Sequence, residues 1–226
     1  MTRNLKIVGM AALACLALSV VGASAAQAAL FHKEPGVETT LTVTPDGTTT
    51  TAHQVFDAAG ASITCPDVSG EAVVGAAENT PATVTATNIL YPRTGSAACK
   101  FVGQTATVKM TSCGFQFTAA APGTPGTNAA VAVVCTVPKD EIHFEVPNPF
   151  CTVTIPAQTL SGVTYHNNAA KSEVTVEAHV TGIEYTASGV GCPTPGVQNN
   201  GNYTTGNFIV TAENKATGVM TPVFVE

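Results

Sequence analysis

The sequence predicts an all-β fold: one or two antiparallel β-sandwich units of the immunoglobulin-like kind, tied by three disulfides, after an N-terminal signal peptide. Threonine, valine, alanine and glycine dominate the chain, and threonine and valine suit a pleated, half-buried strand better than a helix. After residue 28, no stretch of about 12 residues has helical periodicity. Short alternating segments instead recur between turn residues, which is typical of a β-sandwich.

Residues 1–28 have the three parts of a secretory signal peptide: a basic start with Arg3 and Lys6, an apolar run over residues 7–21, and the Ala-x-Ala site Ala26-Gln27-Ala28. A membrane anchor is one alternative, but a run of about 15 apolar residues is shorter than the ~20 of a spanning helix. A lipid anchor at Cys15 is another, but the residues after Cys15 are apolar rather than a polar tether. We therefore expect a secreted or cell-envelope protein with no membrane span after cleavage.

The charge of the chain excludes two classes of partner. Without residues 1–28, seven basic residues face 15 acidic ones, a formal net charge of −8. Nucleic acid requires clustered Lys and Arg, and an anionic membrane surface also attracts basic residues. The partner we expect is an unidentified protein or cell surface, and nothing in the sequence calls for a cofactor.

Six cysteines remain after export, and an even number outside the cytoplasm predicts disulfides. Zinc is the alternative, but no two of the six have the short spacing of structural zinc ligands. They can pair in several ways, and the sequence does not choose rigorously among them. The six are Cys65, Cys99, Cys113, Cys135, Cys151 and Cys192.

Two patterns favour one set of pairs. Cys113 and Cys135 each share an apolar strand face with period two, and a turn-rich link joins the two strands, so a hairpin brings them together. The other pairs come from a weak internal repeat, because the similar blocks 84–91 and 176–185 precede Cys99 and Cys192 by eight and seven residues. The repeat suggests Cys65–Cys99 and Cys151–Cys192.

The expected strands follow one another with short turns, and a Pro- and Gly-rich link at residues 119–130 separates a first β unit, 29–118, from a second, 131–226. In the first unit, Asp46-Gly47 predicts a tight hairpin between two strands. In the second, Gly182 marks a bend or bulge in a long strand, and residues 193–201 form a loop. The strands are expected at 38–44, 48–56, 61–65, 71–74, 82–91, 104–111, 113–117, 131–135, 141–146, 151–155, 160–166, 172–186, 202–213 and 218–225.

The segments Cys151-Thr-Val-Thr-Ile-Pro-Ala-Gln158-Thr, Val163-Thr-Tyr165-His-Asn and Val180-Thr-Gly-Ile-Glu-Tyr185 resemble a group of secreted, cysteine-bearing β-rich proteins of soil actinobacteria. The group has no assigned activity, and the resemblance covers about residues 60–226. It implies export and an all-β fold. Its motifs are structural, so it implies no catalytic residue.

The sequence contains no nucleophile elbow, Gly-rich phosphate loop or His-Glu-x-x-His motif, and no catalytic residue is predicted. The most suggestive set is His143 with Glu141 and Glu145, and His179 with Glu177, because each group shares a polar strand face. If the two strands were neighbours, this set would hold a divalent metal; otherwise it is a solvated sheet face. Four tyrosines are interpreted as core or corner residues rather than a sugar-stacking platform: Tyr91, Tyr165, Tyr185 and Tyr203.

Three functions compete at this point. The one we favour is a non-enzymatic binding or structural protein that contacts a protein or surface through its loops or edge strands. The alternatives are a secreted hydrolase with a dispersed active site and a metal-binding module that uses His143 and His179.

Overall fold

The computed structural model describes residues 29–46, 54–58, 60–120, 129–147 and 150–226. The predicted signal peptide and residues 121–128 of the predicted link lie outside these ranges. The regular elements that it describes are β-strands, as the sequence predicts. Within these ranges, no helix is long and apolar enough to cross a membrane.

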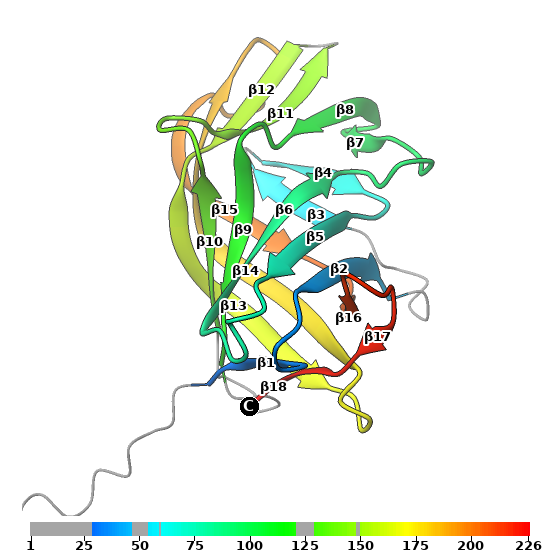
Figure 1. The fold of residues 1–226 in the computed structure, drawn as a ribbon. Coiled ribbons are helices and arrows are strands. Elements are labelled where there is room, and N and C mark those ends of the chain that lie inside the picture. Colours follow the sequence, from blue (N-terminus) through cyan, green and yellow to red (C-terminus); the bar gives the residue numbers. More distant parts are fainter. Residues whose placement is uncertain (1–28, 47–53, 59, 121–128, 148–149) are drawn as a thin grey trace, which may run out of the picture.

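The strands form two closed rings that share one long strand (Figure 1). We call them the lower and upper rings, after their places in Figure 1. In the lower ring each strand pairs with the next along the list and the last pairs with the first: β2 (Thr39–Pro45), β5 (Ser69–Val74), β6 (Thr83–Leu90), β9 (Cys113–Thr118), β10 (Ala129–Cys135), β13 (Gln158–Asn167), β14 (Glu173–Ser188) and β16 (Phe208–Asn214). The short β17 (Met220–Thr221) extends from β16.

The upper ring closes in the same way. Its strands, in order around the ring, are β3 (Gln54–Ala58), β4 (Ala61–Cys65), β7 (Cys99–Phe101), β8 (Gln104–Lys109), β11 (Ile142–Pro147), β12 (Phe150–Ile155), β14 and β15 (Gly196–Thr204). The pairings in both rings are antiparallel. This closed arrangement differs from the two open sheets of the immunoglobulin-like sandwich that the sequence predicts.

The chain alternates between the rings. After β2 it forms β3 and β4 above, returns for β5 and β6 below, and continues in pairs as far as β13 and β14, after which β15 lies above and β16 below. Each ring therefore follows chain order, and the molecule resembles one tall up-and-down barrel whose strands are interrupted at mid-height. Each ring takes strands from both of the predicted units, 29–118 and 131–226.

The long strand β14 passes through both rings because of a bulge. Val174, Val176, Ala178 and Val180 are buried in its first part, whereas Ile183, Tyr185 and Ala187 are buried in its second. The buried residues change from even-numbered to odd-numbered positions at Gly182, which has φ +74° and lies where the register with β15 shifts. Glycine adopts this conformation without strain. The sequence prediction of a bulge at Gly182 is confirmed.

Three disulfides join Cys65–Cys99, Cys113–Cys135 and Cys151–Cys192, the same pairs that the sequence favours. The first two lie at mid-height, where β4 and β10 end and β7 and β9 begin. The third ties the start of β12 to the turn after β14. At the mid-height interruptions, the first two disulfides therefore join paired strands, β4 to β7 and β9 to β10.

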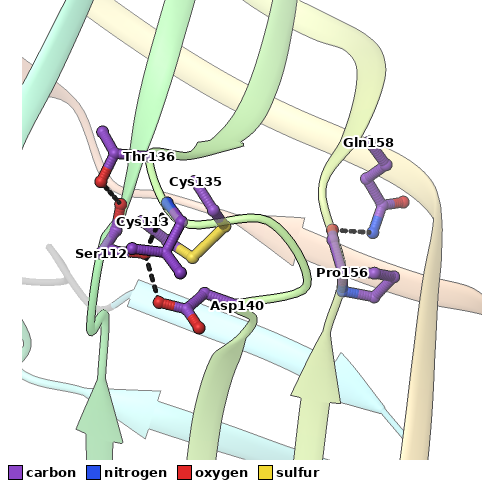
Figure 2. The surroundings of a disulfide bond; sticks show 8 residues. Ser112, Cys113, Cys135, Thr136, Asp140, Pro156 and Gln158 are labelled. Atoms are coloured by element: carbon purple, nitrogen blue, oxygen red, sulfur yellow. Dashed lines mark hydrogen bonds between the residues drawn. A yellow bond between two sulfur atoms is a disulfide. The ribbon is translucent and has the colours of Figure 1, made fainter.

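A buried or half-buried carboxylate accompanies each mid-height disulfide. Beside Cys113–Cys135, the Ser112 hydroxyl donates to Asp140, and the Thr136 hydroxyl donates to the Ser112 carbonyl at 3.3 Å (Figure 2). Near Cys65–Cys99, the carboxylate of Asp67 accepts hydrogen bonds from the Ser96 hydroxyl and, at 2.9 Å, from the Arg93 backbone N–H. These contacts fix the segments that connect the two rings.

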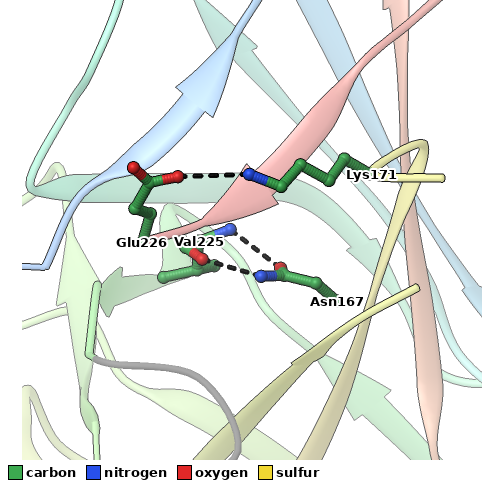
Figure 3. A network of polar contacts seen from close by, with 4 residues as sticks. All are labelled: Asn167, Lys171, Val225 and Glu226. Atoms are coloured by element: carbon green, nitrogen blue, oxygen red, sulfur yellow. Dashed lines mark hydrogen bonds and ion pairs between the residues drawn. The ribbon is translucent and has the colours of Figure 1, made fainter. Parts of the chain in front are cut away.

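A short ribbon of β1 (Phe31–Lys33) and β18 (Val223–Val225) closes the lower end of the molecule. The Asn167 carboxamide bonds to both backbone groups of Val225, accepting from its N–H at 2.9 Å and donating to its carbonyl at 2.8 Å (Figure 3). Lys171 adds an exposed ion pair with Glu226 at 3.3 Å. Phe31, Val223 and Val225 are buried, so the ribbon forms the floor of the lower ring.

Candidate ligand cavities

The interior of the barrel contains two apolar cavities. The central cavity lies between the rings and has a volume of about 90 Å³. The lower cavity lies within the lower ring and has a volume of about 80 Å³. One water needs about 10–15 Å³ on such a scale, so each cavity has room for a small organic molecule. Eight-stranded rings are of the size that either fills with side chains or holds one small ligand.

Strands of both rings line the central cavity, which places it at the mid-height interruptions. Its upper part includes Phe56 and Phe144, whose rings stack with centroids 5.2 Å apart. The full lining is Gln54, Phe56, Ile63, Cys65, Tyr91, Met110, Phe115, Phe117, Val131, Val133, Ile142, Phe144, Ile155, Leu160, Val163, Ala178, Val180, Ile183, Tyr203 and Phe208.

The lower cavity is separated from the central one by four aromatic side chains that line both: Tyr91, Phe115, Phe117 and Phe208. Its floor is the β1–β18 ribbon, and Phe31 contacts Tyr165 edge-to-face with centroids 5.4 Å apart. The rest of the lining is Leu41, Val43, Val68, Ser69, Gly70, Ala72, Val84, Ala86, Ile89, Val174, Val176, Val210 and Val223.

A hydrogen-bonded row of three polar side chains lies on the wall of the central cavity. The Tyr203 hydroxyl on β15 donates to Oε1 of Gln54 on β3 at 2.7 Å, and the Tyr91 hydroxyl lies 2.9 Å from the Tyr203 hydroxyl. Gln54 is only 2% exposed. Its Nε2 has no hydrogen-bond partner among the described residues, and a buried donor without a partner costs about 1–3 kcal/mol.

Burial changes the acidity of these tyrosines. Desolvation raises the pKa of Tyr91 to about 12, and the hydrogen bond with Tyr203 offsets part of this effect. The pKa of Tyr203 lies well above its ordinary value, chiefly because of burial and further because of Tyr91 beside it. Both hydroxyls therefore stay neutral at physiological pH. No charged residue is among the described residues that line the cavity.

The described residues that line the lower cavity form no second row, although Tyr91 of the central row lines both cavities. The Tyr165 hydroxyl there donates to the Thr118 carbonyl at 3.1 Å, which gives it a partner. Burial raises the pKa of Tyr165 above its usual range. The two cavities therefore have similar size and largely apolar walls, and Gln54, with its unpaired donor, lines only the central one.

The predicted metal-binding residues lie apart. His143 on β11 is opposite Thr154 of β12, and Thr154 is opposite Thr186 of β14. His179 lies seven residues before Thr186 on β14, so β12 separates the two strands and the histidines are offset along them. Nowhere in the described part of the chain do three His, Cys, Asp or Glu side chains gather within reach of one ion.

The carboxylates of that predicted set have other neighbours. Glu145 forms an ion pair with Lys109 at 2.7 Å, and Glu177 lies 3.7 Å from Nε2 of His166. Glu177 and His179 do share the outer face of β14, as the alternation predicts. This outer face is polar and solvated, which is the alternative that the sequence left open.

Sequence reasoning identified the tyrosines as core or corner residues but not the row that two of them form with Gln54. Gln54 was expected within the strand 48–56 and had no assigned role. The available signal was a glutamine that alternation places on the same strand face as the apolar Phe56. It becomes meaningful only when the ring places Tyr203 beside it.

Comparison with known proteins finds no matching family model, no matching curated protein and no matching solved structure. The resemblance to actinobacterial secreted proteins therefore stays a prediction. The three disulfides indicate an oxidising, extracellular environment.

Proposed function

We propose that this chain is an exported, non-enzymatic binding protein that holds a small apolar molecule inside its paired rings. The observation that carries the proposal is the pair of apolar cavities lined by the closed rings of strands. Ligand sites in proteins are concave and mostly apolar, with a few placed polar groups. The central cavity has this composition.

The energetics of the cavities favour an occupant. An apolar cavity costs about 24 cal/mol per Å³ because its walls lose packing contacts, or about 2 kcal/mol for each of these two. A molecule that restores those contacts recovers that energy on binding. A cavity of about 150 Å³ holds benzene, so ligands with about three or four non-hydrogen atoms match each cavity.

Export agrees with the extracellular environment that the disulfides indicate and with the predicted signal peptide at residues 1–28. A secreted carrier of small apolar molecules requires a stable fold with an apolar interior, which the disulfide-linked rings supply. The protein or cell-surface partner expected from the sequence stays a prediction.

Xenon binding tests the proposal, because xenon enters apolar cavities without requiring a specific shape. We expect crystals of residues 29–226 under xenon pressure to show one site in each cavity. Ala178→Leu places a larger side chain in the central cavity, and Ala72→Leu is its matched control in the lower cavity. Each variant should lose its own site and keep the other. Wild-type crystals without interior xenon would contradict the proposal.

A further inference from the structure

The row in the central cavity has a definite hydrogen-bond direction. The Tyr203 proton points to Gln54 Oε1, so the Tyr91 hydroxyl donates to the Tyr203 oxygen. Both protons are thus used within the row. The two N–H bonds of Gln54 Nε2 remain, and they have no acceptor among the described residues.

Reversing the Gln54 carboxamide does not remove the unpaired donor. In that orientation an N–H of Gln54 donates to Tyr203, Tyr203 donates to Tyr91, and the Tyr91 proton is left without an acceptor in the row. Either orientation therefore leaves an unpaired donor on a residue that lines the otherwise apolar central cavity. Buried donors in native proteins are nearly always paired, so this one points to an acceptor that is not part of the protein.

We propose that the central cavity selects small uncharged molecules with a carbonyl or ether oxygen, which accepts a hydrogen bond from Gln54 Nε2. This inference rests on the proposed binding function and narrows its ligand class. A pure hydrocarbon leaves the donor unpaired. A carboxylate or an amine places a charge among apolar walls where no described lining residue can pair it.

The lower cavity provides an internal comparison. Besides the shared Tyr91 it is lined by Tyr165, which already donates to the Thr118 carbonyl, and the described residues that line it have no side-chain donor without a partner. We therefore expect the lower cavity to bind the hydrocarbon and the oxygen-containing molecule according to their apolar contacts alone.

Isobutene and acetone form a suitable probe pair, because each has four non-hydrogen atoms in the same planar arrangement and acetone has a carbonyl oxygen in place of a CH2 group. Titrations followed by the methyl NMR signals of Met110 and Leu160 report on the central cavity, and those of Leu41 report on the lower one. The side-chain amide signals of Gln54 should move with acetone and stay nearly unchanged with isobutene. Gln54→Met, similar in size but without a donor, should lower the ketone-to-hydrocarbon affinity ratio about fivefold, the effect of one neutral hydrogen bond. Tyr165→Phe is the control and should leave the ratio unchanged.

The outcomes separate the two proposals. If isobutene binds but the affinity ratio is the same in wild type and Gln54→Met, the donor inference is wrong while the binding function stands. If neither probe perturbs any interior methyl group, the binding function itself fails. Should Gln54→Met not fold, the wild-type Gln54 amide signals decide the inference, and signals unmoved by bound acetone overturn it.

Discussion

The central and lower cavities occupy the same barrel and share four aromatic side chains, yet they differ in what surrounds them. The central cavity lies where most strands are interrupted, next to Cys65 and a hydrogen-bonded row with an unpaired donor. The lower cavity lies inside the lower ring and above the β1–β18 ribbon, where Asn167 forms two hydrogen bonds with the backbone of Val225. The difference is that the unpaired donor belongs to a residue where the strands are interrupted, whereas the Tyr165 hydroxyl inside the regular lower ring has a backbone partner.

Removing the disulfide beside the central cavity should have the largest effect. Cys65→Ala combined with Cys99→Ala opens a loop of 34 residues and should lower the free energy of unfolding by about 4 kcal/mol. Because Cys65 lines the central cavity, probe binding there should weaken while the lower cavity is unaffected. Denaturant unfolding and the methyl titrations measure the two effects.

The matched control is Cys151→Ala with Cys192→Ala, which opens a loop of 41 residues away from both cavity linings. It should destabilise the protein by a similar amount but leave probe binding to the folded state intact in both cavities. An equal loss of central binding in the two double variants would show that the mid-height disulfide has no local role.

Alkaline pH should reveal the buried tyrosines, with a smaller effect. Tyrosine in the unfolded chain ionises near pH 10, whereas burial raises the pKa of Tyr91 to about 12. The folded state keeps protons that the unfolded state releases, so stability is complete below pH 10 and falls as the pH rises toward 12. Tyr91 alone should account for about 2–3 kcal/mol.

The two cavities should differ in this pH response as well. The central cavity has two buried hydroxyls in its row, and the lower cavity adds Tyr165. Tyr91→Phe with Tyr203→Phe should therefore remove more of the alkaline loss than Tyr165→Phe, as measured by denaturant unfolding at pH 8 and pH 11. The same loss in all variants would place the titrating groups elsewhere.

Local patterns predicted the strands better than their partners. Alternation identified the β-structure and the bulge at Gly182, and the period-two faces of Cys113 and Cys135 placed them opposite each other, as they are. The Asp46-Gly47 signal predicted a hairpin, but β2 pairs with β5 and β16 while β3 pairs with β4 and β15. A turn signal depends on a few residues only, so it does not show that β2 and β3 belong to different rings.

Ring closure could not be read from the sequence, because it depends on pairings between distant strands such as β14 with β16 and β6 with β9. The same limit applies to residues 196–201, which lie within the predicted loop 193–201 but form part of β15 through pairing with β14. The candidate site was missed for this reason too. Tyr91, Tyr203 and Gln54 are far apart in the chain, and only the closed rings bring them together.

The most direct measurement is a crystal structure of residues 29–226 soaked in acetone. We predict density for the ketone in the central cavity, with its oxygen within hydrogen-bond distance of Gln54 Nε2. A solid core between the rings, or ketone bound only at the surface, would contradict the account.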